Sequence, residues 1–413
     1  MTMWFFVALL AWVLLVAGFL LRHAATLRAL WREPVLRLPV VIVESDDWGV
    51  GPQGDADMLD RIAQRLVGIR DATGHPAVMT LGLVSGHPDG ARILASGLAQ
   101  YHRRTLDEPA FSTIVEAIRA GCAAGVFAVQ RHGLEHCWPA SLLAQAREDD
   151  SLRRWLADPA ARSEALPSPL QSRWVDAASL PSRPLGAADV MAAVQDEAVL
   201  LQRLFGKAPA VAVPNTFVWD DTVERAWQET GVTCIVTPGR RLEGRTASGG
   251  LGPATYAIRN GDRTHGGVML VVRDEYFEPF RGHRAEKVWA AVGRKRELGR
   301  PVLLETHRES FIAEGGAASL ALDELERALR GVLDRQPDVR FMSTEVLAQH
   351  LADPASPLVL RSPRARAEVF LRRVLCEPSM GRALKVSGLR FLLPLLAGAA
   401  ARVVGRGPAT MAR

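Results

Sequence analysis

Eight short apolar runs alternate with longer segments of helical periodicity through most of this chain. Each run has four to seven residues, is rich in Val, Ile and Leu, and is bounded by turn or polar residues, which is typical of strands buried in a parallel sheet. Alternating strand and helix units in this number predict an α/β barrel. The apolar runs are 38–43, 78–84, 126–130, 210–213, 233–237, 268–272, 302–305 and 339–342, and the helical segments are 57–70, 112–120, 187–205, 220–229, 287–298 and 320–333.

The length of 413 residues suits a single barrel that carries insertions. Two stretches, 86–109 and 138–184, show no clear strand and are interpreted as insertions above or beside the barrel. We therefore expect four parts. They are a transmembrane anchor at 1–22, a basic linker at 23–37, the barrel at 38–350 and a basic C-terminal tail at 351–413.

The first segment, Met3–Leu21, carries no charged side chain. About twenty helical residues cross a hydrocarbon core of about 30 Å, and the run is longer than the apolar region of a typical signal peptide, so a retained single-pass anchor is favoured over a cleaved signal. Basic residues follow the span, which predicts a cytoplasmic catalytic part. The opposite orientation would place it in the periplasm or outside the cell. The basic residues are Arg22, Arg28, Arg32 and Arg37.

The net charge of +5 owes much to an Arg-rich C-terminal tail. A basic tail is typical of binding to nucleic acid or to an anionic membrane surface. We expect no nucleic-acid partner, because the chain has no zinc-finger spacing and no basic repeat with interleaved aromatic residues. The apolar run 391–400 is too short to span a bilayer. A helix lying on the membrane surface and a helix packed on the barrel remain equal alternatives.

The first apolar run leads into Asp46 and Asp47. Carboxylates at the carboxyl end of a barrel strand lie at the mouth, where active sites collect. One aspartate can bind a metal while its neighbour accepts a proton from water. The pair alone is a weak signal, because Asp-Asp pairs also occur at 149–150 and 220–221.

The third run leads into His132, Glu135 and His136. Residues four apart share one face of a helical turn, so the two imidazoles could bind one ion. Glu135 is interpreted either as a carboxylate that orients one of the imidazoles without binding the ion itself, or as a solvated charge.

The seventh run leads into Glu305 and His307. An imidazole titrates near neutral pH and can act as a general acid, and Glu305 could orient it. A barrel brings such strand ends together. A metal held by one Asp and two His side chains keeps coordination positions open for water and substrate, which suits hydrolysis.

These motifs, in this order, resemble those of the NodB-like polysaccharide deacetylases of the glycoside hydrolase/deacetylase barrel superfamily, over about residues 38–345. Ser45–Gly49 is similar to their Thr-Phe-Asp-Asp-Gly motif, and His132–His136 has the spacing of their His-Ser/Thr-x-x-His motif. Leu303–His307 resembles their last motif, which ends in Leu-His. The resemblance implies a distorted (β/α)7 barrel.

The resemblance also implies an activity and a set of roles. Asp46 would be the general base, and His307 the general acid that protonates the departing amine. Asp47, His132 and His136 would bind a divalent metal, most often zinc, which activates the water that attacks the acetyl carbonyl. The implied substrate is an acetylated polysaccharide or lipid-linked sugar, with an N-acetyl group favoured over an O-acetyl group.

The chain departs from the family pattern at several positions. The arginine that normally precedes the proline pair and steers the base is absent, and Ala212–Asn215 stands there. The only candidate for the later Asp-rich motif is Val272–Tyr276, where Asp274 is interpreted as structural or surface. Aromatic faces suit pyranose rings. The candidate substrate-binding residues are Trp48, Pro214, Phe217 and Trp219.

Two other functions remain open at this stage. A glycoside hydrolase on the same barrel would need two carboxylates that flank the scissile bond, and Asp46 with Glu305 or Glu135 could supply them. The paired histidines argue against this function. A non-catalytic barrel scaffold in a membrane polysaccharide-assembly system is the third hypothesis.

Overall fold

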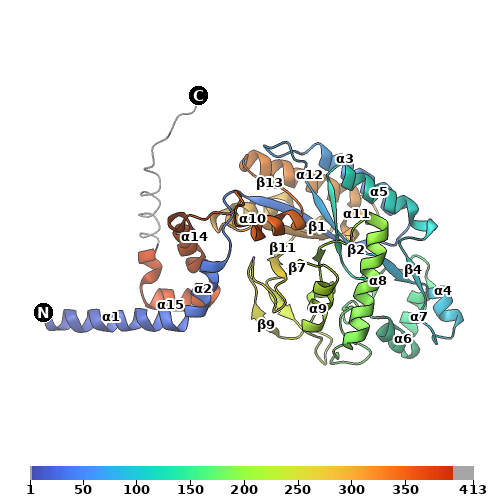
Figure 1. The fold of residues 1–413 in the computed structure, drawn as a ribbon, viewed down its shortest axis with the longest axis horizontal. Coiled ribbons are helices and arrows are strands. Elements are labelled where there is room, and N and C mark those ends of the chain that lie inside the picture. Colours follow the sequence, from blue (N-terminus) through green and yellow to red (C-terminus); the bar gives the residue numbers. More distant parts are fainter. Residues whose placement is uncertain (1, 394–413) are drawn as a thin grey trace. The chain divides into compact units, whose positions relative to one another are not determined.

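The computed structural model describes residues 2–393, which divide into two compact units (Figure 1). The barrel unit comprises Val40–Val292 and Val302–Ala352. The terminal unit comprises the described parts of Met1–Pro39, Gly293–Pro301 and Asp353–Arg413.

The barrel unit is built on one sheet of parallel strands. Along the sheet the order is β10, β7, β6, β5, β2, β1, β12 and β11, and β13 also pairs with β1. The strands are β1 (Val40–Gly49), β2 (Met79–Val84), β5 (Phe127–Arg131), β6 (Val211–Ala212), β7 (Cys234–Thr237), β10 (Met269–Val272), β11 (Glu275–Tyr276), β12 (Val302–His307) and β13 (Arg340–Phe341).

The two ends of the sheet are joined by the covalent chain and not by hydrogen bonds between strands. Strands β10 and β11 stand at opposite ends of the hydrogen-bonded order, yet only Arg273 and Asp274 separate them in sequence. One segment therefore pairs first with β7 and then with β12. Within the described residues the strands form a ring of seven positions, in which β10 and β11 share one position. The break in hydrogen bonding between β10 and β11 is called the seam below. This arrangement confirms the predicted α/β fold and distorted (β/α)7 barrel.

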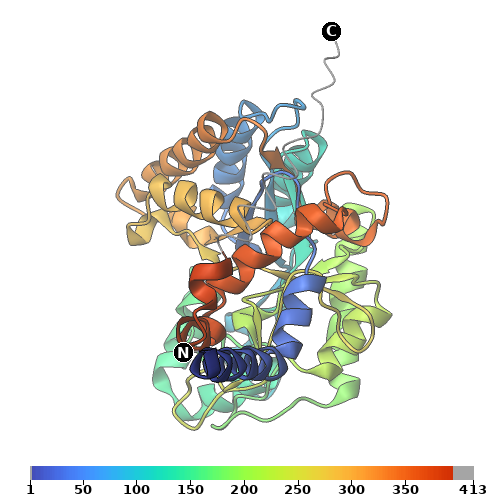
Figure 2. The same ribbon diagram turned by 90° about the vertical axis from the view of Figure 1, so that its left-hand side faces the viewer.

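Helices cover the outer face of the ring, and Figure 1 and Figure 2 both show α3, α5 and α12 side by side. All ten residues of β1 are buried, as expected for a parallel strand covered on both faces. The six predicted helices are present as α3 (Gly54–Val67), α5 (Ser112–Ala123), α8 (Ala187–Phe205), α9 (Asp221–Glu229), α10 (Ala285–Glu297) and α12 (Ala317–Arg335), and α11 (Arg308–Ile312) and α13 (Thr344–Ala352) accompany them.

The two insertions have more structure than the sequence indicated. Their apolar residues form a small core of their own, which includes Ile93, Leu142 and Leu156. The first insertion holds β3 (Gly86–Pro88), α4 (Gly90–Ala95) and β4 (Arg103–Thr105), the second holds α6 (Pro139–Glu148) and α7 (Asp150–Ala157), and a separate hairpin is formed by β8 (Arg240–Leu242) and β9 (Ala254–Ala257).

The terminal unit is helical. Its helices are α1 (Thr2–Arg22), α2 (Ala24–Arg32), α14 (Pro363–Cys376) and α15 (Gly381–Val386), so a helix occupies most of the predicted linker. The segment Met3–Arg22 has the length and composition to cross a membrane, a property that it shares with signal sequences. Most of the predicted apolar run 391–400 lies outside the described residues.

Candidate metal centre and active site

An irregularity in β1 brings Asp46 and Asp47 into the same pocket. Adjacent side chains of a regular strand point to opposite faces of the sheet. Here the register between β1 and β2 shifts between Ser45 and Trp48, and Asp47 has a φ of 71°. A bulge of this kind re-aims a side chain, so both carboxylates line one cavity at the mouth of the barrel.

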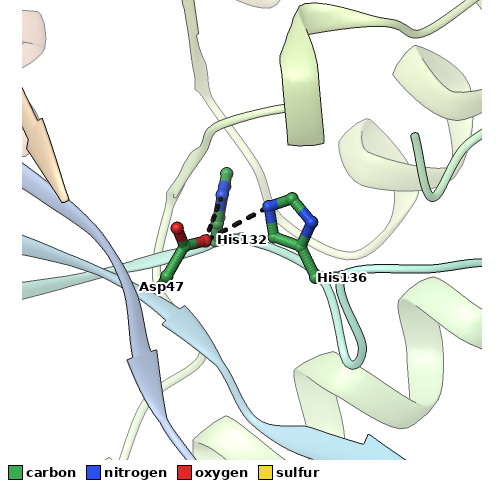
Figure 3. A group of neighbouring side chains, drawn as sticks. All are labelled: Asp47, His132 and His136. Carbon is green, nitrogen blue, oxygen red and sulfur yellow. Dashed lines mark ion pairs between the residues drawn. The ribbon is translucent and has the colours of Figure 1, made fainter. Parts of the chain in front are cut away.

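Three side chains form a buried cluster with the composition of a metal site (Figure 3). Asp47 Oδ1 lies 3.4 Å from His132 Nε2 and 3.2 Å from His136 Nε2. Burial alone would raise the pKa of Asp47, but the imidazoles of His136, His132 and His307 outweigh it and hold the pKa well below its usual range. The cluster therefore presents a carboxylate and two imidazole nitrogens to one point.

The hydrogen bonds around the cluster leave its ligand atoms available to a cation. His132 Nδ1 lies 2.9 Å from the carbonyl oxygen of Val213, which can only accept, so Nδ1 carries a proton and Nε2 is the nitrogen that would bind a cation. His136 Nδ1 is buried without a hydrogen-bond partner among the described residues. Three ligands of these types suit a divalent cation with open coordination positions.

The helical interpretation of the histidine pair is wrong. Residues 132–136 follow β5 as a loop, and the two rings meet at a centroid distance of 5.2 Å. The loop turns at Gly133, whose φ is 90° and where an added Cβ would lie 2.8 Å from the Glu135 carbonyl oxygen. The turn therefore requires glycine.

Arg273 supplies a guanidinium group to the predicted base, in place of the arginine that is absent before Pro214. Its Nη2 lies 2.6 Å from Asp46 Oδ2, its Nη1 3.0 Å from Glu44 Oε2 and its Nε 3.5 Å from Glu305 Oε2. Burial would raise the pKa of Asp46, but Arg273 and the nearby imidazoles outweigh it and lower that pKa, so the carboxylate stays ionised.

Arg273 occupies the seam between β10 and β11, within the segment 272–276 that the sequence marked as a candidate motif. Two residues of this segment, Arg273 and Tyr276, line the site, and Asp274 does not.

Glu278 takes the role that the sequence analysis gave to Glu305. His307 ends β12 beside Asp46 in the strand register, and its Nδ1 lies 2.5 Å from Glu278 Oε1. Burial would lower the pKa of His307, but the hydrogen bond to Glu278 and the charges of Asp47 and Asp46 outweigh it and raise the pKa to about 10. Glu278 is itself fully buried and also accepts hydrogen bonds from Thr306 and Ser310.

Replacing Glu278 with glutamine is expected to lower the pKa of His307, because the carboxylate that stabilises the imidazolium is removed. NMR titration of the full chain with labelled histidine measures this shift. The wild-type pair stabilises the fold fully below pH 6.5, and the contribution is lost as the pH rises towards about 10. The control is Glu286→Gln, at an exposed carboxylate that does not line the pocket. An unchanged pKa in Glu278→Gln would contradict this assignment.

Glu135 does not contact an imidazole. Its carboxylate is buried between Arg103, 2.6 Å away, and Arg173, 2.5 Å away, and it accepts a hydrogen bond from Tyr101. These contacts join the loop after β5 to both insertions, so Glu135 acts as a structural counter-charge.

Two of the four candidate substrate-binding residues are core residues. Trp48 and Trp219 are 0% exposed. Trp48 donates a hydrogen bond to Ser45 Oγ, and Trp219 donates one to Glu224 Oε1. Their apolar rings fill the interior, and the prediction that they contact a sugar is therefore wrong. Pro214 and Phe217 do line the cavity.

The cavity at the barrel mouth has a volume of about 260 Å³. It collects Asp46, Asp47, His132, His136 and His307 on its walls, together with Glu305 and Arg273. The sequence analysis did not assign several further lining residues to the site, because they lie in the second insertion or beside the motifs rather than at the motif positions that suggested chemistry. These residues are Glu164, Gln171, Thr216, Tyr276, Arg281 and Glu309.

No protein-family model and no curated protein matches the chain. Similar solved structures include a family 4 carbohydrate esterase from Streptomyces lividans in complex with acetate, at 13% identity over 79% of this chain and 99% of that chain, with a TM-score of 0.35. A peptidoglycan N-acetylglucosamine deacetylase is similar at 12% identity, over 77% of this chain and 91% of its own, with a TM-score of 0.36.

A 4-alpha-glucanotransferase from Thermococcus litoralis is also similar, at 8% identity over 84% of this chain and 48% of its own, with a TM-score of 0.42. A carbohydrate esterase and a peptidoglycan deacetylase are thus among the solved structures that are similar to this chain. Likeness at these scores assigns no activity to this chain, so the proposal below rests on the geometry of the site.

Proposed function

We propose that this protein is a metal-dependent hydrolase that removes an acetyl group, an N-acetyl group in preference to an O-acetyl group, from a glycan. The observation that carries the proposal is the buried cluster of Asp47, His132 and His136 beside an ionised Asp46, with His307 in the same cavity. Hydrolysis of an amide needs a base, an acid and an electrophile in one place, and this cavity offers residues for all three.

Asp47, His132 and His136 would hold the divalent cation, and zinc suits a set of imidazole nitrogens and one carboxylate oxygen. When bound, the cation polarises a carbonyl oxygen and lowers the pKa of water.

Asp46 acts as the base. One of its oxygens, Oδ2, is held by Arg273, and the other, Oδ1, is buried without a hydrogen-bond partner among the described residues. The neighbouring position in β2 is Gly82, where an added Cβ would lie 2.3 Å from Asp46 Oδ1. The glycine leaves room for the free oxygen, which can take a proton from water.

His307 acts as the acid. Because Glu278 binds Nδ1, the proton on Nε2 remains available to the departing amine, and the raised pKa of His307 keeps the ring protonated at neutral pH. The ion pair thus both orients the ring and maintains its acid form.

The segment Met3–Arg22 tethers the enzyme to a membrane in this proposal, with the catalytic unit in the cytoplasm because the arginines follow the span. The substrate is then a polysaccharide or a lipid-linked sugar within reach of that surface. Pro214 and Phe217 contact the sugar that carries the acetyl group.

Acetate release tests the proposal. The full chain in detergent, loaded with Zn²⁺, is incubated with N-acetylglucosamine oligomers and with O-acetylated xylan. We expect acetate from the oligomers, and a loss of about 10²- to 10⁴-fold in Asp46→Asn because the base is removed. Asp150→Asn is the control at an exposed Asp-Asp pair. Cleavage of the sugar chain would favour the glycoside hydrolase, and absence of any reaction from the metal-loaded protein would favour the scaffold.

A further inference from the structure

A second and larger cavity lies beside the candidate active site. Its volume is about 710 Å³, against about 260 Å³ for the pocket that holds Asp46 and His307. Its walls come from the loop after β1, from α4 and from the end of α7, two helices that lie side by side in Figure 1. The two insertions therefore build, together with the barrel, a cavity that the barrel alone does not have.

One ion pair connects the linings of the two cavities. Arg308 lines the large cavity and Glu164 lines the catalytic pocket, and Arg308 Nη2 lies 2.7 Å from Glu164 Oε1. Arg308 is 3% exposed and also contacts Asp55 at 3.3 Å. A residue that lines one cavity is thus ion-paired to a residue that lines the other, so the two cavities are neighbours.

The guanidinium groups of the large cavity are matched within the protein, and two of its carboxylates, Asp89 and Asp158, accept backbone hydrogen bonds, while Glu314 also lines it. Its guanidinium groups at Arg104, Arg162 and Arg308 each have a carboxylate partner, which is Glu108 for the first and Asp55 for the other two. A cavity whose cations are already neutralised offers little to an anionic ligand. It favours a neutral ligand that uses hydrogen bonds and apolar contact.

The lining also has the chemistry that a sugar ring requires. The rings of His87 and Trp155 lie together on its wall, with a centroid distance of 5.6 Å and an angle of 39°. An indole presents a broad apolar face, and the CH groups on one face of a pyranose pack against such a surface. Apolar residues such as Pro88 and Phe111 share the wall with the arginines, which can still donate hydrogen bonds.

The volumes of the two cavities indicate how the sugar units of a glycan would be distributed between them. Ligand pockets usually measure about 300–1,000 Å³, so the catalytic pocket falls below this range and the large cavity falls within it. The catalytic pocket accordingly suits the one acetylated sugar that reacts.

We infer that the large cavity is a binding subsite for further neutral sugar units of the glycan on which the catalytic pocket acts. This inference rests on the proposed function. It makes the enzyme select for chain length, because an oligosaccharide fills both cavities whereas a monosaccharide fills one.

Calorimetric titration of the full chain in detergent tests the inference with N-acetylglucosamine and its β-1,4-linked dimer, trimer and tetramer. We expect the trimer to bind at least about tenfold more tightly than the monosaccharide, a gain equivalent to one well-packed aromatic contact. Trp155→Ala removes the ring, and Ala91→Trp fills the cavity from an exposed position on α4. Each variant is expected to abolish the advantage of the trimer.

The control is Tyr256→Ala, at an aromatic residue on β9 that is 45% exposed and does not line the cavity. It is expected to keep the advantage of the trimer. Affinity that does not depend on chain length, or an advantage that survives in both cavity variants, overturns the inference, and acetate release from the monosaccharide would then leave the proposed function standing. Length-dependent binding that both variants lose, without any acetate release, supports the subsite and overturns the proposed reaction.

Discussion

Asp47→Ala and His136→Ala are each expected to lose the bound cation and to lower the rate of acetate release by at least about 10³-fold. Both residues belong to a three-ligand set in which the candidate ligand atoms lie within 4.8 Å of one another. With one ligand removed, two donors remain and the cation is held weakly. The cation supplies several kcal/mol of transition-state stabilisation, and each 1.36 kcal/mol is worth about tenfold in rate.

The measurement is the zinc content of the purified full chain by mass spectrometry, paired with the rate of acetate release. We expect about one equivalent in the wild type and none in either variant, with circular dichroism showing that both variants remain folded. His75→Ala is the matched control, because this imidazole is exposed and lies outside the pocket. Retention of one equivalent in both ligand variants would contradict the assigned metal site.

Arg273→Met is expected to destabilise the fold by about 3–5 kcal/mol, because it leaves carboxylates buried without their cation. Arg273 is 1% exposed and contacts Glu44, Asp46 and Glu305, of which Glu44 is fully buried and Asp46 is 1% exposed. Chemical denaturation of the full chain measures the loss. Arg327→Met, which breaks an exposed ion pair with Glu286, is expected to cost less than about 1 kcal/mol.

The same substitution has a predicted pH dependence. Arg273 lowers the pKa of Asp46, so its removal raises that pKa and moves the acidic limb of kcat/KM to higher pH. The stability deficit shrinks as the pH falls, because the carboxylates take up protons and no longer need the guanidinium. An acidic limb that stays in place, or a deficit that does not change with pH, would show that Arg273 does not control the base.

The strands of the barrel and most of the helices that cover it could be predicted from the sequence. Apolar periodicity is a local property and reports which residues are buried, so all eight predicted strands and six predicted helices appear, with bounds within a few residues except at β1, which continues six residues further. It also placed Asp46, Asp47, His132, His136 and His307 at strand ends, and the structure gathers these five side chains around one cavity.

Sequence by itself could not find the partners that control those side chains. Arg273 lies 227 positions from Asp46, and Glu278 lies 29 positions from His307. An ion pair forms between groups that are close in space. The order of the strands in the sheet and the position of its seam decide which distant carboxylate or guanidinium faces a given group. No periodicity along the chain carries that information.

The sequence by itself therefore determined the type of barrel and the five chemically important residues that reach its mouth from strand ends, since both depend on local burial and on where strands end. Only the tertiary structure decided how these residues work. The bulge in β1 turned both aspartates to one side, the seam brought Arg273 to Asp46, and packing placed Trp48 and Trp219 in the core. Each of these outcomes depends on contacts between elements far apart in sequence, where the energy of burying a charge or a ring is set by its neighbours.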